Sequence, residues 1–182
     1  MITLSRLTED ALAFIMKCRM SPEIDKMMFT SVKLTMDGQR KWFEKIKNSD
    51  KEIRWVIKVD NKPVGSMYFT DIDRGNKRCE SGWFVADKSG LQLKDIIALQ
   101  QNSYDYAFDV LGLNRVYGYV IDSNKGILRL LQCCGIKKEG ELAEHVVKDG
   151  VTHNVVVVGL TKSQWKDMKE NTGIEYPKFE IE

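Results

Sequence analysis

The sequence is poor in the residues that build metal centres and disulfide frameworks. Its 182 residues include four cysteines, three prolines and two histidines. No two cysteines form a CxxC pair, and His145 and His153 are the only imidazoles, so no tetrahedral zinc site is expected. No apolar run reaches the roughly 18 residues of a membrane span, and the N-terminus lacks the basic-then-apolar pattern of a secretion signal. We therefore expect no metal and no membrane association.

An excess of one charge is also missing. The chain has 28 basic and 26 acidic residues, which gives a formal net charge of +2. These charges are intermixed rather than gathered into a basic face, so a nucleic-acid partner is not expected. A hydrophobic fraction of 43% and a charged fraction of 30% are typical of a globular protein. Buried, reduced cysteines would suit a cytoplasmic location.

The spacing of apolar residues alternates between the strand period of two and the helix period of 3.6. It predicts an α/β (α+β) fold with a mixed central sheet of about seven strands and helices on both faces. The strands on either side of the long helix should be parallel, with the helix as their crossover. Residues 1–173 form one domain in this interpretation, and 174–182 form a poorly packed C-terminal tail. The predicted strands are 2–6, 54–59, 64–70, 79–86, 115–121, 142–147 and 154–159, and the predicted helices are 8–18, 93–110, 124–134 and three that begin at Ser21, Thr35 and Thr161.

The stretch 114–140, NRVYGYVIDSNKGILRLLQCCGIKKEG, carries the most specific pattern: a strand, a break, an amphipathic helix, a Gly stop and a second strand. It resembles the C-terminal half of the GNAT acyl-CoA N-acyltransferases. Asn124, Gly135 and the pair Glu139-Gly140 match that family, whereas Leu131 stands where the family has Tyr. With RMSPEI, QRKWFEKI and PVGSMYFTDID upstream, the chain is similar to the branch of ribosomal-protein N-terminal and nucleotide-amino-sugar acetyltransferases.

The resemblance implies acetyl-CoA as acyl donor. In the family, the loop before the long helix and that helix's N-terminus hold the pyrophosphate of CoA. The pantetheine arm bonds to the end of the preceding strand and to the family Asn. The residues expected at this cofactor site are therefore Phe84, Val85, Ala86, Ser89, Gly90, Leu91, Lys94, Asn124 and Leu131. Without the resemblance, the same residues suit a paired core strand, a surface loop and a helix N-cap.

Aminolysis of a thioester requires a neutral amine, so a general base must take a proton from the ammonium. Glu80 is the candidate, because relatives carry Glu in a similar Cys-Glu-x-Gly context. His145 and His153 have suitable intrinsic pKa values but stand beside a predicted hairpin turn. Glu80 also fits a solvent-facing strand position or a structural salt bridge. Leu131 cannot protonate the leaving thiolate, so the usual Tyr general acid is absent and slower turnover is expected.

The resemblance assigns acceptor binding to the N-terminal helices and the late hairpin. The candidates from matched positions are Arg19, Met28, Gln39, Trp42, Tyr68 and Asp71. The preferred acceptor is the primary amine of a small molecule, a nucleotide-linked amino sugar. The alternatives are a protein N-terminus or polyamine as acceptor, and a non-catalytic CoA-binding or interaction protein. Family members often dimerise, so a homodimer is also an expectation.

Overall fold

A single mixed sheet forms the centre of the molecule. The structure, a computed structural model, describes all 182 residues. The sheet has eight strands in the order β6-β7-β5-β4-β3-β2-β1-β8. The strands are β1 Ile2–Arg6, β2 Ile53–Val59, β3 Lys62–Asp73, β4 Arg78–Val85, β5 Arg115–Ile121, β6 Lys137–Lys148, β7 Val151–Thr161 and β8 Glu180–Ile181.

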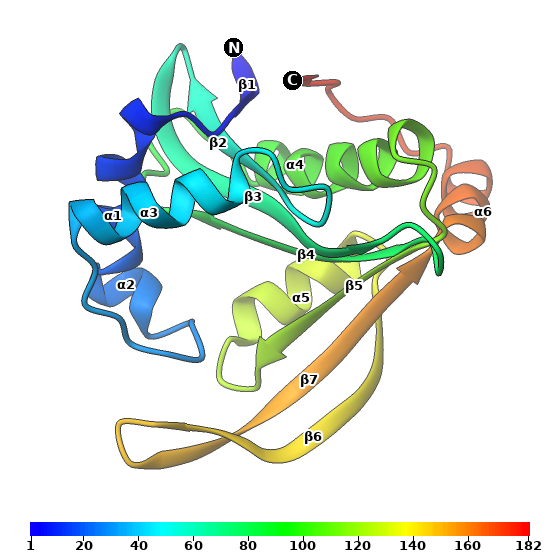
Figure 1. Cartoon of the computed structure of the whole chain (residues 1–182). Coiled ribbons are helices and arrows are strands. Elements are labelled where there is room, and N and C mark those ends of the chain that lie inside the picture. The colour runs from blue at the N-terminus through cyan, green and yellow to red at the C-terminus, as the bar shows by residue number, and fades with distance from the viewer.

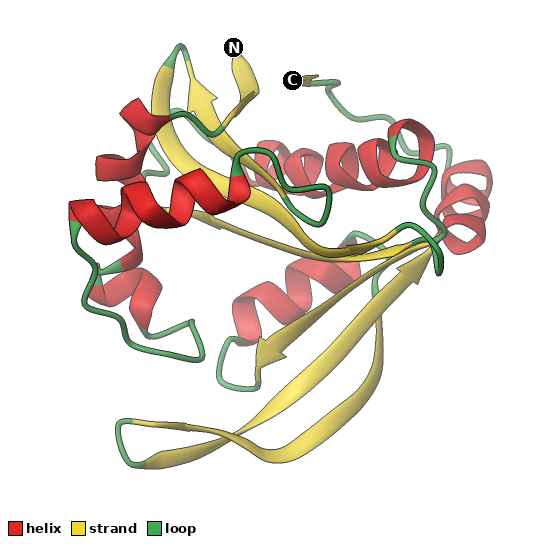
Figure 2. Cartoon of the chain, viewed as in Figure 1, coloured by secondary structure: helices red, strands yellow, loops and turns green.

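Helices cover both faces of this sheet (Figures 1 and 2). One face carries the N-terminal helices α1 Leu12–Arg19, α2 Pro22–Asp25 and α3 Met36–Ile46, preceded by a short 3₁₀ turn at Glu9–Ala11. The opposite face carries α4 Leu93–Asp105, which continues as the π-helical turn Tyr106–Val110, and α5 Lys125–Cys133. Helix α6, Lys162–Thr172, follows the last long strand. No helix is long and apolar enough to cross a membrane.

Side-chain caps fix two of the helix starts that the sequence predicts. Thr35 Oγ1 accepts from the Gly38 N–H at 3.2 Å at the start of α3. Thr161 and Gln164 form a reciprocal capping box at the start of α6. Both caps satisfy amide groups that have no partner inside the helix, and so they fix where each helix begins.

The predicted parallel pair is β4 and β5, and it is short. Only three residue pairs join them: Arg78 with Arg115, Cys79 with Val116, and Glu80 with Tyr117. β4 nevertheless stays paired with β3 as far as Val85, and β5 stays paired with β7 as far as Ile121. The two halves of the sheet therefore diverge after Glu80, as Figure 1 shows.

The main core lies between the sheet and the face of α4. Trp55 of β2 and Phe69 of β3 are almost completely buried, and they pack with Tyr106 at ring-centroid distances of 5.1 to 6.4 Å. Cys18, Cys79 and Cys134 are buried, as expected, but Cys133 is exposed. Leu93 does not join this core, because its side chain is 69% exposed at the first position of α4.

The C-terminal tail is packed against the domain, so the prediction of a poorly packed tail is wrong. Residues 180–181 form β8, which pairs in parallel with β1 and adds an eighth strand to the seven expected. The indole of Trp55 donates to the Glu182 carbonyl oxygen at 2.7 Å, and Asn102 of α4 bonds to the backbone of Pro177 and Phe179. The tail carries four large apolar residues, and three of them, Tyr176, Phe179 and Ile181, pack against the main core.

Candidate active site

The divergence of β4 from β5 creates the one place where a central strand lacks a neighbour. Residues Ser81–Val85 pair with β3 on one side and have no paired strand on the other. Ser81 Oγ lies there, buried and without a hydrogen-bond partner. A Cβ on Gly118 of β5 would sit 3.2 Å from the Ser81 carbonyl oxygen, so glycine lets β5 approach β4 closely where the split begins. Unpaired strand groups of this kind suit a ligand that inserts between the strands.

Glu80 stands at the last paired position before the split. Its side chain lies on the face of the sheet that carries α1 to α3, and it is half-buried. Burial raises the pKa of this carboxyl above its usual range, and the neighbouring Asp71 raises it further. No hydrogen bond or ion pair with a basic side chain holds Glu80 in place. A half-buried carboxylate without a partner and with a raised pKa has the properties of a general base.

Asp71 is turned toward this position by an irregularity in β3. The register between β3 and β4 shifts between Thr70 and Asp73, and Asp71 has φ +49°. The hydroxyl of Tyr117, the β5 partner of Glu80, donates to Asp71 Oδ2. Burial raises the pKa of Tyr117 above its usual range, as does the hydrogen bond to Asp71, so the phenol stays protonated. Bulges near active sites commonly re-aim a side chain in this way.

Tyr68 lies on the same face two residue pairs further along. It lies opposite Gly82, where a Cβ would fall 2.3 Å from the Tyr68 hydroxyl oxygen, so Gly82 leaves room for the ring. The guanidinium of Arg54 lies 4.7 Å from the centroid of the Tyr68 ring and 5.0 Å from that of Trp42. Glu80, Tyr117, Asp71 and Tyr68 therefore share one surface beside the split.

The predicted donor residues on β4 lie at the free end of the strand. Phe84 and Val85 are buried, Phe84 against α1 and α2 and Val85 in the main core. Ala86 is exposed, and its N–H donates to the Val64 carbonyl oxygen at 2.8 Å. Since these side chains pack inward, only the backbone of this strand end faces the split. Their contact with a cofactor stays a prediction.

The loop before α4 is partly satisfied by its own carboxylates. Asp87 accepts from the Ser89 N–H at 2.8 Å, and Asp95 accepts from the Gln92 N–H at 2.8 Å. Gly90 has φ +77° and, with Ser89 and Lys94, is exposed, whereas Leu91 is half-buried. The predicted phosphate-binding loop therefore offers exposed residues and the N-terminus of α4, but two of its backbone amides already donate to acidic side chains.

The two predicted donor residues around α5 are also engaged within the chain. Asn124 Oδ1 accepts from the Ile127 N–H at 3.3 Å, so Asn124 is the N-cap of the helix. Leu131 is 7% exposed and belongs to the main core. No hydroxyl occupies the position where the family has Tyr. Cofactor contacts by Asn124 and Leu131 stay predictions.

Four predicted acceptor residues, Arg19, Met28, Gln39 and Trp42, come from the N-terminal helices and the loop between α2 and α3. Arg19 pairs with Asp25 at 3.4 Å and donates to the Thr30 carbonyl oxygen at 2.8 Å. The Met28 carbonyl oxygen accepts from Lys148, a buried lysine of β6 that also pairs with Asp25 at 3.1 Å. Gln39 is 8% exposed. Lys148 thus ties α2 and the residues after it to the β6–β7 hairpin. Tyr68 and Asp71 lie on the Glu80 surface, and Arg19 lies close to it: burial raises the pKa of Tyr68, and the charge of Arg19 opposes this.

Sequence reasoning did not assign roles to Tyr117, Ser81 or Asp95. Tyr117 follows from strand alternation once the β4–β5 register is known, but that register requires the structure. His145 is exposed, and His153 lies 3.5 Å from Asp122. No group of three or more His, Cys, Asp or Glu side chains is arranged to hold a metal ion.

Comparison with known proteins places this geometry in a family. Residues 2–137 match the family described as the acetyltransferase (GNAT) domain. The putative ribosomal N-acetyltransferase YdaF of Bacillus subtilis is 27% identical over 111 residues, which is 60% of this chain and 60% of that protein. The match therefore spans less than two thirds of YdaF. The spermidine N(1)-acetyltransferase of Vibrio cholerae is 23% identical over 171 residues, 93% of this chain and 98% of that protein.

The Vibrio cholerae enzyme also has the same fold. Its crystal structure in complex with CoA and spermine superposes with a TM-score of 0.84 at 22% identity, covering 91% of this chain and 98% of that one. The same enzyme has been described as a dodecamer. The fold expected from the motifs is confirmed, and the family match covers most of the sequence. The chain belongs to the GNAT acetyltransferase family.

Proposed function

We propose that this protein transfers an acetyl group from acetyl-CoA to the primary amine of a small molecule, with Glu80 as general base. The observation that carries the proposal is the split of β4 from β5 directly after the pair Glu80 and Tyr117. The split leaves unpaired backbone on β4 beside a carboxylate whose pKa burial raises. A thioester that enters from the α4 side would meet an amine that enters from the α1–α3 side.

The residues beside the split fit the pantetheine part of the donor. Ser81 Oγ is buried without a partner, and a polar chain with amide groups satisfies such an atom. The exposed loop residues Ser89, Gly90 and Lys94, with the N-terminus of α4, are the proposed contacts for the phosphates. When bound, acetyl-CoA supplies the acyl thioester.

Glu80 takes a proton from the acceptor ammonium, directly or through one water. The neutral nitrogen then forms the new C–N bond at the acyl carbon, the C–S bond breaks to release a thiolate, and the nitrogen loses its second proton to water as the amide forms. Leu131 cannot donate a proton, so water protonates the thiolate. Loss of one acid–base group typically costs about 10²–10⁴-fold in rate, so a slow enzyme is expected rather than an inactive one.

The charge of the acceptor surface favours a cationic amine. Glu80 and Asp71 face the same surface, and neither forms an ion pair with a lysine or arginine. The spermidine acetyltransferase relative acts on a polyamine by its name, which supports a polyamine as acceptor. The putative ribosomal acetyltransferase YdaF keeps a protein N-terminus as the alternative. The nucleotide-linked amino sugar receives no support from these relatives.

A non-catalytic CoA-binding protein is the second candidate function. It is favoured by two observations: the buried Leu131 in place of Tyr, and the carboxylate of Asp95 at the N-terminus of α4. Both departures concern groups that act on the donor.

Two measurements test these functions in turn. Thermal-shift titration with acetyl-CoA, against ATP as control, should raise the melting temperature; no shift at millimolar ligand would contradict both functions. Thiol release with spermidine, a peptide with a free N-terminus and a nucleotide-linked amino sugar should then be fastest with spermidine. Donor binding without thiol release from any amine would support the non-catalytic protein.

A further inference from the structure

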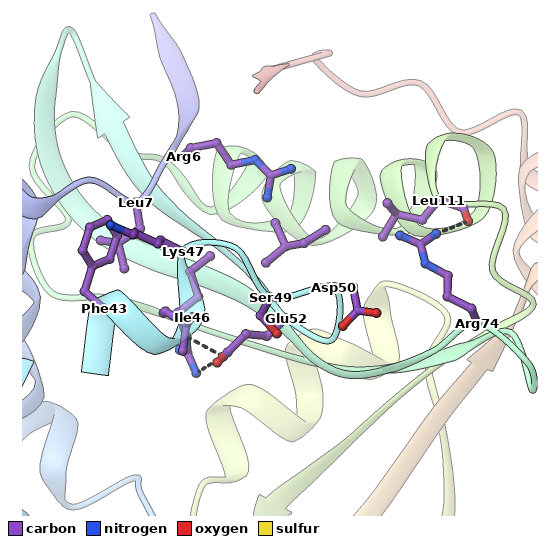
Figure 3. A pocket seen from close by; sticks show the side chains of 12 residues that line it. Arg6, Leu7, Phe43, Ile46, Lys47, Ser49, Asp50, Glu52, Arg74 and Leu111 are labelled. Atoms are coloured by element: carbon purple, nitrogen blue, oxygen red, sulfur yellow. Dashed lines mark hydrogen bonds and ion pairs between the residues drawn. The ribbon is translucent and has the colours of Figure 1, made fainter. Parts of the chain in front are cut away.

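A cavity at the end of the sheet opposite the donor loop lies outside the residues that the proposed reaction uses. It has a volume of about 460 Å³ and lies where β1 ends and β2 begins. Figure 3 shows Arg6 entering it from the end of β1 and Arg74 from the turn after β3. Its size falls within the range of small-molecule sites.

Five of the twelve residues that line the cavity are apolar: Leu7, Phe43, Ile46, Ile53 and Leu111. They come from α3, from the adjoining ends of β1 and β2 and from the end of the π-helical turn, so several elements converge on one space. Apolar side chains brought together in this way suit the hydrocarbon or aromatic body of a ligand.

The charged residues that line the cavity carry an excess of positive charge. They are the four cations Arg6, Lys47, Arg54 and Arg74 and the two acids Asp50 and Glu52. Glu52 pairs with Arg54 at 2.9 Å, and Lys47 pairs with Glu44 outside the cavity at 2.6 Å. The charges that remain are Arg6, Arg74 and Asp50, so the cations are in excess.

Arg6 and Arg74 keep most of their donors free. The guanidinium of Arg6 lies over the ring of Trp55 at 5.3 Å and donates no hydrogen bond within the chain, while the backbone N–H of Arg6 donates to Glu182 Oε2 at 3.1 Å. Arg74 uses one N–H, which donates to the Leu111 carbonyl oxygen at 3.2 Å. Neither forms an ion pair with an acidic side chain. A guanidinium presents five N–H donors in a fork that matches a carboxylate, so both are prepared to bind one.

We propose that the Arg6–Arg74 cavity, lined by the residues named above, binds a small carboxylate with an apolar body. The carboxylate accepts from Arg6 and Arg74, and the body packs on Phe43, Ile46 and Leu111. The cavity also adjoins the acceptor surface, because Arg54 lines it and stacks on Tyr68. The ligand is either the far end of an amine acceptor or a separate effector, and the carboxylate chemistry is common to both.

Direct binding tests the site without any need for enzymatic activity. Benzoate is the probe, and benzamide is the control of the same shape without charge. Calorimetric titration of the full chain should show benzoate binding at least about tenfold more tightly than benzamide, since a charge-assisted hydrogen bond contributes more than a neutral one. Equal affinity for the two, or no benzoate binding at millimolar concentration, would overturn the proposal.

Variants locate the binding. Arg74→Gln and Arg6→Gln should each weaken benzoate binding about tenfold or more, with benzamide unchanged. Arg129→Gln is the matched control, because Arg129 is an exposed arginine of α5 outside the cavity. Arg74 is exposed in a turn, so its variant keeps the test valid if Arg6→Gln destabilises the fold. Loss of affinity in Arg129→Gln equal to that in Arg74→Gln would also overturn the proposal.

Kinetics then separate the two sources of the carboxylate. If it belongs to the acceptor, an ω-amino acid has a lower KM than the matching alkylamine, Arg74→Gln removes that difference, and benzoate competes with the amino acid. If it belongs to an effector, benzoate changes kcat for the alkylamine without competing. Either result supports the site, whereas failure of the proposed acetyl transfer would leave the binding measurement unaffected.

Discussion

At the scale of single residues, Glu80 carries the proposed proton transfer. Glu80→Gln should lower thiol release about 10²–10⁴-fold while leaving the melting-temperature shift with acetyl-CoA unchanged. Glu23→Gln is the control, because Glu23 is an exposed acid of α2 without an ion pair. Unchanged turnover in Glu80→Gln would remove this residue from the mechanism.

The raised pKa of Glu80 also predicts the pH profile. The base acts only when deprotonated, so turnover should fall as pH drops through the pKa of Glu80. Burial and Asp71 both raise that pKa. The acid limb of kcat/KM should therefore lie above the usual range of a glutamate, and Asp71→Asn should move it to lower pH. An acid limb that stays in place in Asp71→Asn would contradict the coupling.

Asp95 offers a second test at one position. Its carboxylate binds the Gln92 N–H at the start of α4, where the phosphates of a donor would bind. Asp95→Asn removes a negative charge there, so CoA should bind several-fold more tightly, in line with about 0.3–1 kcal/mol for a charge at a helix end. Pantetheine lacks the pyrophosphate, and its affinity should not change. An equal gain in affinity for CoA and pantetheine would show that Asp95 does not act on the phosphates.

At the scale of elements, close approach between β3 and β4 holds the split strand in place. A Cβ on Gly65 would fall 2.2 Å from the Phe84 carbonyl oxygen, which is backbone and cannot move aside cheaply. Gly65→Ala should lower the free energy of unfolding by about 1–3 kcal/mol and weaken donor binding. Gly126→Ala is the control: nothing lies within 4 Å of the position that its Cβ would take, and it should be neutral or stabilising. Urea unfolding measures both.

The helices and strands differ from the strand register in how well the sequence predicts them. Apolar spacing and the caps at Thr35 and Thr161 are local signals, and they indicate the order of helices and strands and the parallel pair. The shift of β3 at Asp71 and the bond from Tyr117 depend on register between strands far apart in sequence. Hence the motif makes Glu80 a candidate base, whereas it gives no role to its neighbour Tyr117.

At the scale of the whole molecule, one half-buried acid holds the C-terminal tail in the position from which its last strand pairs with β1. Asp105, at the end of α4, accepts from Trp165, Lys169, Tyr176 and Lys178. Two of these donors lie in α6 and two in the tail, and β8 then pairs with β1. Asp105 therefore joins α4, α6 and the tail, which brings the last strand beside the first.

Because of Asp105, the free energy of unfolding should depend on pH in the acid range. Burial opposes ionisation of Asp105, but hydrogen bonds from Lys178, Tyr176, Trp165 and Lys169 outweigh it and lower its pKa from 3.8 to about 2. A lowered pKa stabilises the folded state above the pKa of the unfolded chain, and this contribution disappears as pH falls through the folded value. Because the group is partly exposed, the contribution at neutral pH is about 1–2 kcal/mol.

Asp105→Asn should therefore lower the free energy of unfolding at neutral pH by that amount, and its deficit relative to the unchanged chain should shrink as pH falls from about 4 to about 2. Asp109→Asn is the matched control, because Asp109 is an exposed acid one turn further on that pairs with Lys162 at 3.3 Å. It should change stability by less than about 0.5 kcal/mol. Urea unfolding across this pH range measures both variants. A deficit in Asp105→Asn that does not depend on pH would show that the charge of Asp105 does not hold the tail, and that the shape of the side chain alone does.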